Sequence, residues 1–549
     1  MQVTPELFQR YLEEMRDLEA FRLQYLNFNP RVPLDRDDPD VQRIVEALAW
    51  FNASSKHRVR HSQLLTTRRI FQQFFSYMLD PLPAMAMLEA RQTGRFVETA
   101  ELPRGAEVVL TTPDRKEAIF YTLWDMRLLP CSLTGLEFIP RIGRGYRLLL
   151  RFRAPYARND DINTLSLYIN QFDDFYTSLR IQQAIRKHVT GCFIAFGENV
   201  TSQTEGTPCD LRFGPPKAED VDSDDRFAHP IERVRSFFHF PERDLFMNIR
   251  VPSTPHLWET FTIGLDLDEL WPTSVSFNEE TFRPGVVPVV NLRRLMAEPF
   301  LSDGTETSFP VIYPEPGDSF EVHSLNAVYQ ITDKGYRPIR PGVLSQGGAS
   351  FELEPADGDK GGSLLRLKAP ESFLRPMQVA VDANWHQPWL SKRTGEKLTV
   401  SLYDRHLSGL VWELAGKVAP LRENPARHDV DTLLEILSLR MKTQLDLDEL
   451  KLILSALGSV EYSPFRDMPR LIEKLDVEKL PHGREELAGY RLRYNITLRQ
   501  MDDSLLPLVD MFYSQLQRLL DSWIPDTVVE IRVETFNRER KIDFGGSAA

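Results

Sequence analysis

A histidine pair is the first place in this sequence where chemistry could reside. His57 and His61 lie four residues apart, a spacing that on a helix places both imidazoles on one face, as a metal site requires. The zinc-protease pattern also needs a glutamate directly after the first histidine, and Arg58 stands there among further cations. We therefore interpret this stretch as an exposed basic helix face.

Three further stretches are similar to ligand-binding loops, and each lacks a residue that its loop needs. The acidic run 219–225 alternates aspartates like a calcium loop, but Asp225 and Ile231 stand where that loop has glycine and glutamate. The turn 357–362 lacks the lysine that should precede the serine of a phosphate-binding loop. The stretch 141–146 lacks the third glycine of a dinucleotide-binding loop. We expect no catalytic, cofactor-binding or metal-binding residues, and no enzyme.

The composition is that of an ordinary globular protein, with 549 residues, 42% of them hydrophobic and 26% charged. Acidic residues outnumber basic ones by 79 to 66, and the resulting net charge of −13 disfavours nucleic acid as a partner. The three cysteines, Cys131, Cys192 and Cys209, are too few for a disulfide framework or a four-thiolate zinc site, and they indicate a reducing compartment.

No segment approaches the ~20 consecutive apolar residues that cross a bilayer, and acidic residues interrupt the N-terminal stretch where a signal peptide would be apolar. We expect a cytoplasmic protein without direct membrane insertion, which reaches a membrane only through partners.

Aromatic residues crowd the stretch RVRSFFHFPERDLFMNIRV at 233–251, where Phe237, Phe238 and Phe240 lie within four positions of one another. A base-stacking platform pairs aromatics with a cationic groove, but acidic neighbours neutralise the arginines here. Each large aromatic that leaves water contributes on the order of a few kcal/mol. The pattern favours packing in a core or against another subunit.

Helical periodicity dominates the first 80 residues. One helix is predicted to begin at Pro5 and a second at Pro39, each after a good N-cap residue. A third is predicted over 64–78, before the prolines at 81 and 83. The first helix has an unusually broad apolar face, which one β domain cannot cover, so it requires a partner helix.

From residue 84 onward the pattern changes to short apolar runs with period two, separated by proline and glycine. Strands are predicted at 165–169, 286–292, 308–314, 319–325, 378–384, 490–498 and 529–533, and helices at 172–185, 433–439, 447–457 and 505–523. The predicted class is multidomain α+β. The predicted parts are an N-terminal helical bundle segment (1–83), a first β-rich domain with packed helices (84–265), a second β-rich, sandwich- or barrel-like domain (266–425) and a C-terminal α+β unit (426–549).

Several ordered segments are similar to one known family. ERVRSFFHFPERDLFMNIRV (232–251) resembles the E-x-x-x-x-F-x-F-P-E-x-x-x-F segment of the TssF family, the baseplate wedge subunits of the bacterial type VI secretion system. VVPVVNLRRLMAEPF (286–300) resembles that family's P-V-x-N-L-F-x-x-x-A-E-P segment. Residues 80–88, 102–108 and 309–331 also fit in the right order.

The resemblance implies a scaffold whose fold is similar to wedge proteins of contractile phage baseplates. In that family, two TssF copies combine with one TssG, partly through a bundle of N-terminal helices, and the complex joins TssK. Such wedges surround the spike hub (VgrG), and TssE docks on them to start assembly of the sheath around the inner tube at the inner-membrane complex. We expect the partner interface to include Leu7, Phe8, Tyr11, Met15, Leu18 and Phe21.

Two alternatives remain open from the sequence. One is a wedge protein of a phage tail or of an extracellular contractile particle. The other is a carbohydrate-active or carbohydrate-binding protein with β domains, for which Trp385 and Trp389, flanking His386, are the best candidate residues.

Overall fold

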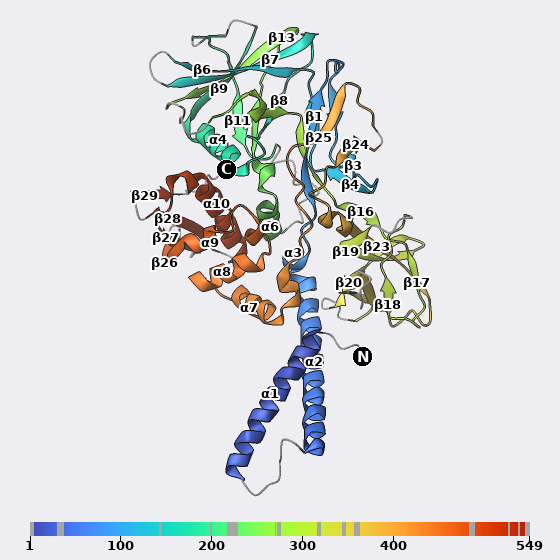
Figure 1. Cartoon of the computed structure of the whole chain (residues 1–549). Helices are drawn as coiled ribbons and strands as arrows, with labels where there is room; N and C mark the ends of the chain where they lie inside the picture. Colours follow the sequence, from blue (N-terminus) through green and yellow to red (C-terminus); the bar gives the residue numbers. More distant parts are fainter. Residues whose placement is uncertain are drawn as a thin grey trace.

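The computed structural model has a body of β-sheets and helices from which a two-helix hairpin projects (Figure 1). It describes residues 5–29, 38–141, 145–197, 200–201, 203–216, 229–269, 271, 276–315, 320–342, 347–355, 363–403, 405–482, 489–524, 527–535 and 538–543. The multidomain α+β class predicted from the sequence is confirmed.

The hairpin consists of α1 (Pro5–Phe28) and α2 (Pro39–Phe74), and a short α3 (Ser76–Leu79) follows. Asp38 caps α2 by accepting a hydrogen bond from the backbone N–H of Asp40 at 2.9 Å. The second and third predicted helices are one continuous helix of 36 residues, so that part of the prediction is wrong. The polar stretch between them lacks apolar periodicity but holds no proline or glycine that would end a helix.

A six-stranded sheet with the order β24-β3-β4-β15-β1-β25 lies in the body beyond the hairpin (Figure 1). Its strands are β1 (Met85–Gln92), β3 (Glu107–Thr111), β4 (Glu117–Thr122), β15 (Val286–Val290), β24 (Thr399–Leu402) and β25 (Leu410–Leu414). A separate pair joins β2 (Ala100–Leu102) to β5 (Met126–Leu128). The large sheet takes strands from both predicted segments 84–265 and 266–425, and the division into those domains stays a prediction.

Two further sheets lie at the end of the body opposite the hairpin (Figure 1) and share one hydrophobic core. Their orders are β10-β9-β13-β7-β6 and β11-β12-β8-β14. The elements here are β6 (Ser132–Pro140), β7 (Tyr146–Arg158), β8 (Thr164–Ile169), α4 (Phe175–His188), β9 (Val189–Phe196), β10 (Thr207–Pro208), β11 (Asp210–Phe213), β12 (Phe246–Arg250), β13 (Trp258–Leu267) and β14 (Phe282–Pro284). The helix α6 (Pro230–His239), which precedes β12 in the sequence, belongs to the main hydrophobic core instead. The strand predicted at 165–169 and the helix predicted at 172–185 are confirmed as β8 and α4.

Residues 293–386, here called the arm, form a further sheet at the side of the body (Figure 1). Its strand order is β16-β23-β19-β20-β21-β22-β18, and β17 also pairs with β23. The strands are β16 (Arg293–Met296), β17 (Phe300–Ser302), β18 (Ser308–Pro310), β19 (Glu321–Thr332), β20 (Gly335–Pro341), β21 (Ser350–Pro355), β22 (Ser363–Lys368) and β23 (Met377–His386). Strands predicted at 308–314, 319–325 and 378–384 correspond to β18, β19 and β23.

The C-terminal part packs helices on a sheet of order β26-β27-β28-β29, in which β27 and β28 run parallel. Its elements are α7 (Val430–Arg440), α8 (Leu447–Ala456), α9 (Met468–Leu471), β26 (Ile472–His482), β27 (Gly489–Leu498), α10 (Leu506–Trp523), β28 (Val528–Thr535) and β29 (Arg538–Asp543). The helices and strands predicted between 433 and 533 are therefore confirmed.

The aromatic run of residues 237–240 lies in the main core. Phe237, Phe238 and Phe240 are buried, and the ring centroid of Phe238 lies 5.5 Å from that of Phe465 and 5.7 Å from that of Phe512. The run therefore packs α6 against the C-terminal part of the same chain, and the core interpretation is confirmed.

Candidate assembly interface on the helical hairpin

The two hairpin helices contact each other along a narrow seam. Leu7 of α1 is only 1% exposed, and Ala49 and Ala53 of α2 are wholly buried. Small side chains such as these alanines let two helix backbones approach closely. The ring centroids of Tyr11 and Trp50 lie 6.0 Å apart across the seam, in an edge-on arrangement.

A charged pair lies in the middle of this seam. Lys56 Nζ donates to Glu14 Oε1 at 2.5 Å, and the Glu14 side chain is largely buried. This hydrogen bond raises the pKa of Lys56 above its ordinary value. A polar pair within an otherwise apolar helix seam fixes the register of the two helices.

A strict heptad pattern runs along α1, from the seam toward the free end of the hairpin. Steps of four and three residues connect Leu7, Tyr11, Glu14, Leu18, Phe21, Tyr25 and Phe28. This 3.5-residue period is typical of a coiled-coil seam. The first four of these positions are buried or half-buried, whereas the last three are exposed.

The exposed half of the seam lies where the helices diverge toward the free end of the hairpin (Figure 1). Phe21 is 64% exposed and Phe28 is 85% exposed. On α2, Ile44, Leu48 and Phe51 follow one another at the same spacing and are also exposed. We call these six residues, Phe21, Tyr25, Phe28, Ile44, Leu48 and Phe51, the open face.

The structure divides the six interface residues predicted from the sequence into two groups. Leu7 is buried, and Tyr11, Met15 and Leu18 are half-buried within the hairpin. Phe8 and Phe21 are exposed. Their role in partner binding stays a prediction. The sequence reasoning missed the open-face residues of α2, although the heptad spacing of the aromatics on α1 was a signal for an unfilled seam.

The hairpin joins the body through residues 76–83, here called the root segment. Arg235 of α6 is 1% exposed and donates to three backbone carbonyls. Its acceptors are Tyr77 O at 2.5 Å, Asp80 O at 2.9 Å and Leu457 O at 2.9 Å. A buried guanidinium with all these partners holds the root segment against the C-terminal part.

Further side chains from distant elements hold the same segment. His239 Nε2 donates to Pro83 O at 2.8 Å, and His323 Nε2 donates to Pro81 O at 2.7 Å. Asn424 Nδ2 donates to a carbonyl of α3 at 2.6 Å. Burial lowers the pKa of His239 to about 4, so its imidazole is neutral at neutral pH. The root segment is therefore fixed by hydrogen bonds from α6, the arm and the loop before α7.

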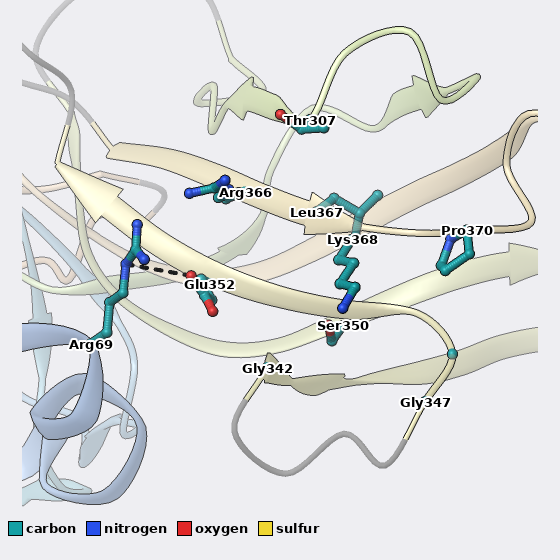
Figure 2. A pocket seen from close by; sticks show the side chains of 11 residues that line it. Arg69, Thr307, Gly342, Gly347, Ser350, Glu352, Arg366, Leu367, Lys368 and Pro370 are labelled. Atoms are coloured by element: carbon teal, nitrogen blue, oxygen red, sulfur yellow. Dashed lines mark ion pairs between the residues drawn. The ribbon is translucent and has the colours of Figure 1, made fainter. Parts of the chain in front are cut away.

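Two ion pairs connect α2 to the body near the root. Arg69 Nε lies 3.5 Å from Glu352 Oε2 of β21, and Figure 2 shows this pair beside an open pocket of the arm that Arg366 and Lys368 also line. Arg60 Nη2 lies 2.7 Å from Asp431 Oδ2 of α7. Both side chains of the Arg60 pair are exposed, so that pair contributes little to stability by itself, whereas the Arg69 pair is half-buried.

Most of the candidate chemical sites from the sequence lie partly or wholly outside the described residues. His57 lies on α2, as predicted, whereas the side chain of His61 and the stretches 219–225 and 357–362 lie outside the described residues. Residues 142–144 of the stretch 141–146 also lie outside the described residues. Within the described residues, no group of three or more His, Cys, Asp or Glu is placed to hold a metal ion.

Of the two tryptophans proposed as a sugar platform, Trp385 is not available for stacking. Trp385 is 1% exposed and donates through Nε1 to Leu295 O at 2.9 Å, so it is a core residue of the arm. Trp389 is half-buried, with Lys116 Nζ 5.9 Å from its ring centroid. The carbohydrate interpretation of Trp385 is therefore wrong. Among the helices of the described residues, none is long and apolar enough to cross a membrane.

Two solved structures share this fold. A chain of the TssK–TssF–TssG baseplate subcomplex of a type VI secretion system, determined by cryo-electron microscopy, matches with a TM-score of 0.71 and 15% identity, over 93% of this chain and 99% of that one. A chain of the type VI secretion baseplate complex matches with a TM-score of 0.60 and 14% identity, over 96% of each chain. This chain therefore has the fold of chains found in type VI secretion baseplates.

Residues 3–350 match the family model described as type VI secretion system, TssF. The chain belongs to the TssF family, and the resemblance noted in its sequence is confirmed. A search of curated proteins found no match.

Proposed function

We propose that this chain is a structural baseplate subunit that assembles through its hairpin with TssG and with a second copy of itself, and that the complex binds TssK. The observation that carries the proposal is the open face, where an unfinished coiled-coil seam leaves aromatic side chains in water. A partner helix with its own apolar seam would complete the pattern begun by α1 and α2.

The energetics favour such a partner. Each large apolar side chain of the open face gains about 1.5–3 kcal/mol when it is fully removed from water. The six residues lie at heptad spacing on two neighbouring helices and are all exposed: Phe21, Tyr25 and Phe28 on α1, and Ile44, Leu48 and Phe51 on α2. Exposed apolar regions of this kind mark sites of protein association.

The family membership supports the finer parts of the proposal. A chain of the same fold occurs in a subcomplex named for TssK, TssF and TssG. On that basis we assign this chain a place in a cytoplasmic wedge around the spike hub (VgrG), where TssE docks and sheath and inner-tube assembly begins, with docking to the inner-membrane complex through partners. No enzymatic step belongs to this role.

Co-purification tests the hairpin as the TssG-binding site. Replacing Phe21 and Phe51 together by serine should abolish co-purification with TssG, because two anchors of the open face are lost while the hairpin seam is untouched. The control is Leu301→Ser, which removes an equally exposed apolar side chain from the arm and should leave TssG binding unchanged. Unchanged binding by the Phe21/Phe51 variant would exclude the open face.

A further inference from the structure

Two of the three cysteines, 17 positions apart in the sequence, lie opposite each other in the sheet at the far end of the body. β10 pairs with β9 in the register Thr207 to Ile194 and Pro208 to Phe193. The next pair is Cys209 and Cys192, and the Cys209 N–H donates to Cys192 O at 2.9 Å. Directly opposed residues of antiparallel strands point to the same face.

The spacing of this pair suits a disulfide. Opposed residues in antiparallel strands have Cα atoms about 4.5–5.5 Å apart, and disulfides join Cα atoms about 4.4–6.8 Å apart. Gly206 brings β10 close to β9, since a Cβ at that position would lie 2.2 Å from the Phe193 ring and 2.4 Å from Ile194 O. The bond could therefore form without separating the strands.

The two thiols have different environments. Cys192 is buried, and Cys209 is half-buried at the edge of the same core. A hydrogen bond between the two side chains lowers the pKa of Cys209 and raises the pKa of Cys192. The backbone N–H of Ile194 also lowers the pKa of Cys209. Cys209 is thus the more readily formed thiolate and the more accessible nucleophile.

The third cysteine provides a contrast within the chain. Cys131 is buried at 4% exposure, and burial raises its pKa to about 12. A buried thiol with a raised pKa is inert toward oxidants.

We propose that Cys209 and Cys192 form an oxidisable dithiol whose oxidant is a hydroperoxide such as hydrogen peroxide. The Cys209 thiolate attacks one peroxide oxygen, the O–O bond breaks, and the departing hydroxide takes a proton to become water, which leaves a sulfenic acid. The Cys192 sulfur then attacks Cys209 Sγ, and hydroxide leaves and takes the Cys192 proton to become a second water. Two thiols and one hydrogen peroxide give one disulfide and two waters.

The disulfide would fasten β10 to β9 at an edge of the five-stranded sheet. Because the bond closes the chain between the two cysteines, it restricts the unfolded state and raises the midpoint of thermal unfolding. β9 lies at the end of the molecule opposite the hairpin (Figure 1), so the site is independent of the proposed open face.

Peptide mapping of the purified full-length chain after treatment with hydrogen peroxide tests the proposal. The expected result is a linked peptide pair containing Cys192 and Cys209, lighter by two hydrogen atoms than the reduced pair and restored by dithiothreitol. Cys131→Ser should form the same link, and both Cys192→Ser and Cys209→Ser should lose it. In Cys192→Ser, the sulfenic acid at Cys209 should be trapped by dimedone, because no resolving thiol remains.

Two results would overturn the proposal. One is sulfinic acid at Cys209 of the wild-type chain without any link to Cys192. The other is equal reactivity of Cys131 and Cys209 toward the peroxide.

Discussion

Arg235 is a buried cation that donates hydrogen bonds to two backbone carbonyls of the root segment. Replacing it by methionine keeps the volume but leaves the carbonyls of Tyr77, Asp80 and Leu457 without this donor. We predict a loss of about 3 kcal/mol or more in the free energy of unfolding, measured by urea denaturation. Arg250→Met, at an exposed position of β12, should change stability by less than about 0.5 kcal/mol. Equal effects of the two substitutions would contradict this role of Arg235.

His239 should make stability depend on pH. Burial lowers its pKa in the folded chain to about 4, with Arg422, Arg235 and Arg243 reinforcing the shift. The unfolded imidazole has the ordinary pKa of about 6.5. Between these values the unfolded state binds more protons, so stability is lost as the pH falls from about 6.5 to about 4. Above that window both states are neutral and His239 has no effect on the pH dependence.

His239→Gln isolates this contribution, since the glutamine amide can still donate to the Pro83 carbonyl but does not titrate. Between pH 6.5 and 4 the variant should lose up to about 3 kcal/mol less stability than the wild-type chain, measured by denaturation at each pH. If the free energy of unfolding fell equally with pH in both proteins, the pKa of His239 would not be lowered in the folded chain.

At the scale of elements, the hairpin depends on the close approach of its helices. Ala53 is wholly buried in the seam, whereas Ala47 lies exposed on the same helix. Ala53→Leu should overpack the seam at a cost of about 1–3 kcal/mol, which would speed hydrogen exchange in α1 by about tenfold or more. Ala47→Leu is the matched control and should leave exchange in α1 unchanged. If Ala53→Leu also left hydrogen exchange in α1 unchanged, the close contact at Ala53 would not hold the two helices together.

Most individual elements could be predicted from the sequence because their signals are local. N-caps and prolines marked the starts of α1 and α2, and period-two alternation marked β8 and β27. α6 was missed as a helix, since its crowded phenylalanines obscure any clear period. The pairing of Cys192 with Cys209 depends on strand register, which spacing along the chain does not reveal.

At the scale of the whole molecule, the sequence could not predict which segments share a sheet. β1 pairs with β15 on one side and with β25 on the other, although about 200 and 320 residues separate them in the chain. Each strand buries its side chains in the same way whichever neighbour it has, so periodicity specifies the strand and not its partner. The contacts of the root segment could not be predicted from the sequence either, because Arg235 and His239 are distant from it along the chain and meet it only in the fold.

The open face also depends on arrangement in space. A heptad pattern on α1 indicates a helical partner, but only the structure shows that the first four heptad positions are buried or half-buried and that Phe21, Tyr25 and Phe28 are exposed. The sequence therefore predicted an apolar interface on this helix without separating the intramolecular seam from the free surface.

Hydrogen exchange measured on the full chain, alone and bound to TssG, tests the central claim most directly. If a partner helix completes the seam, exchange should slow on binding in the second half of α1 and the first half of α2, residues 18–28 and 39–52. The strands of the arm should exchange at the same rate in both samples. A stable complex in which those hairpin segments exchange as fast as in the free chain would contradict the account.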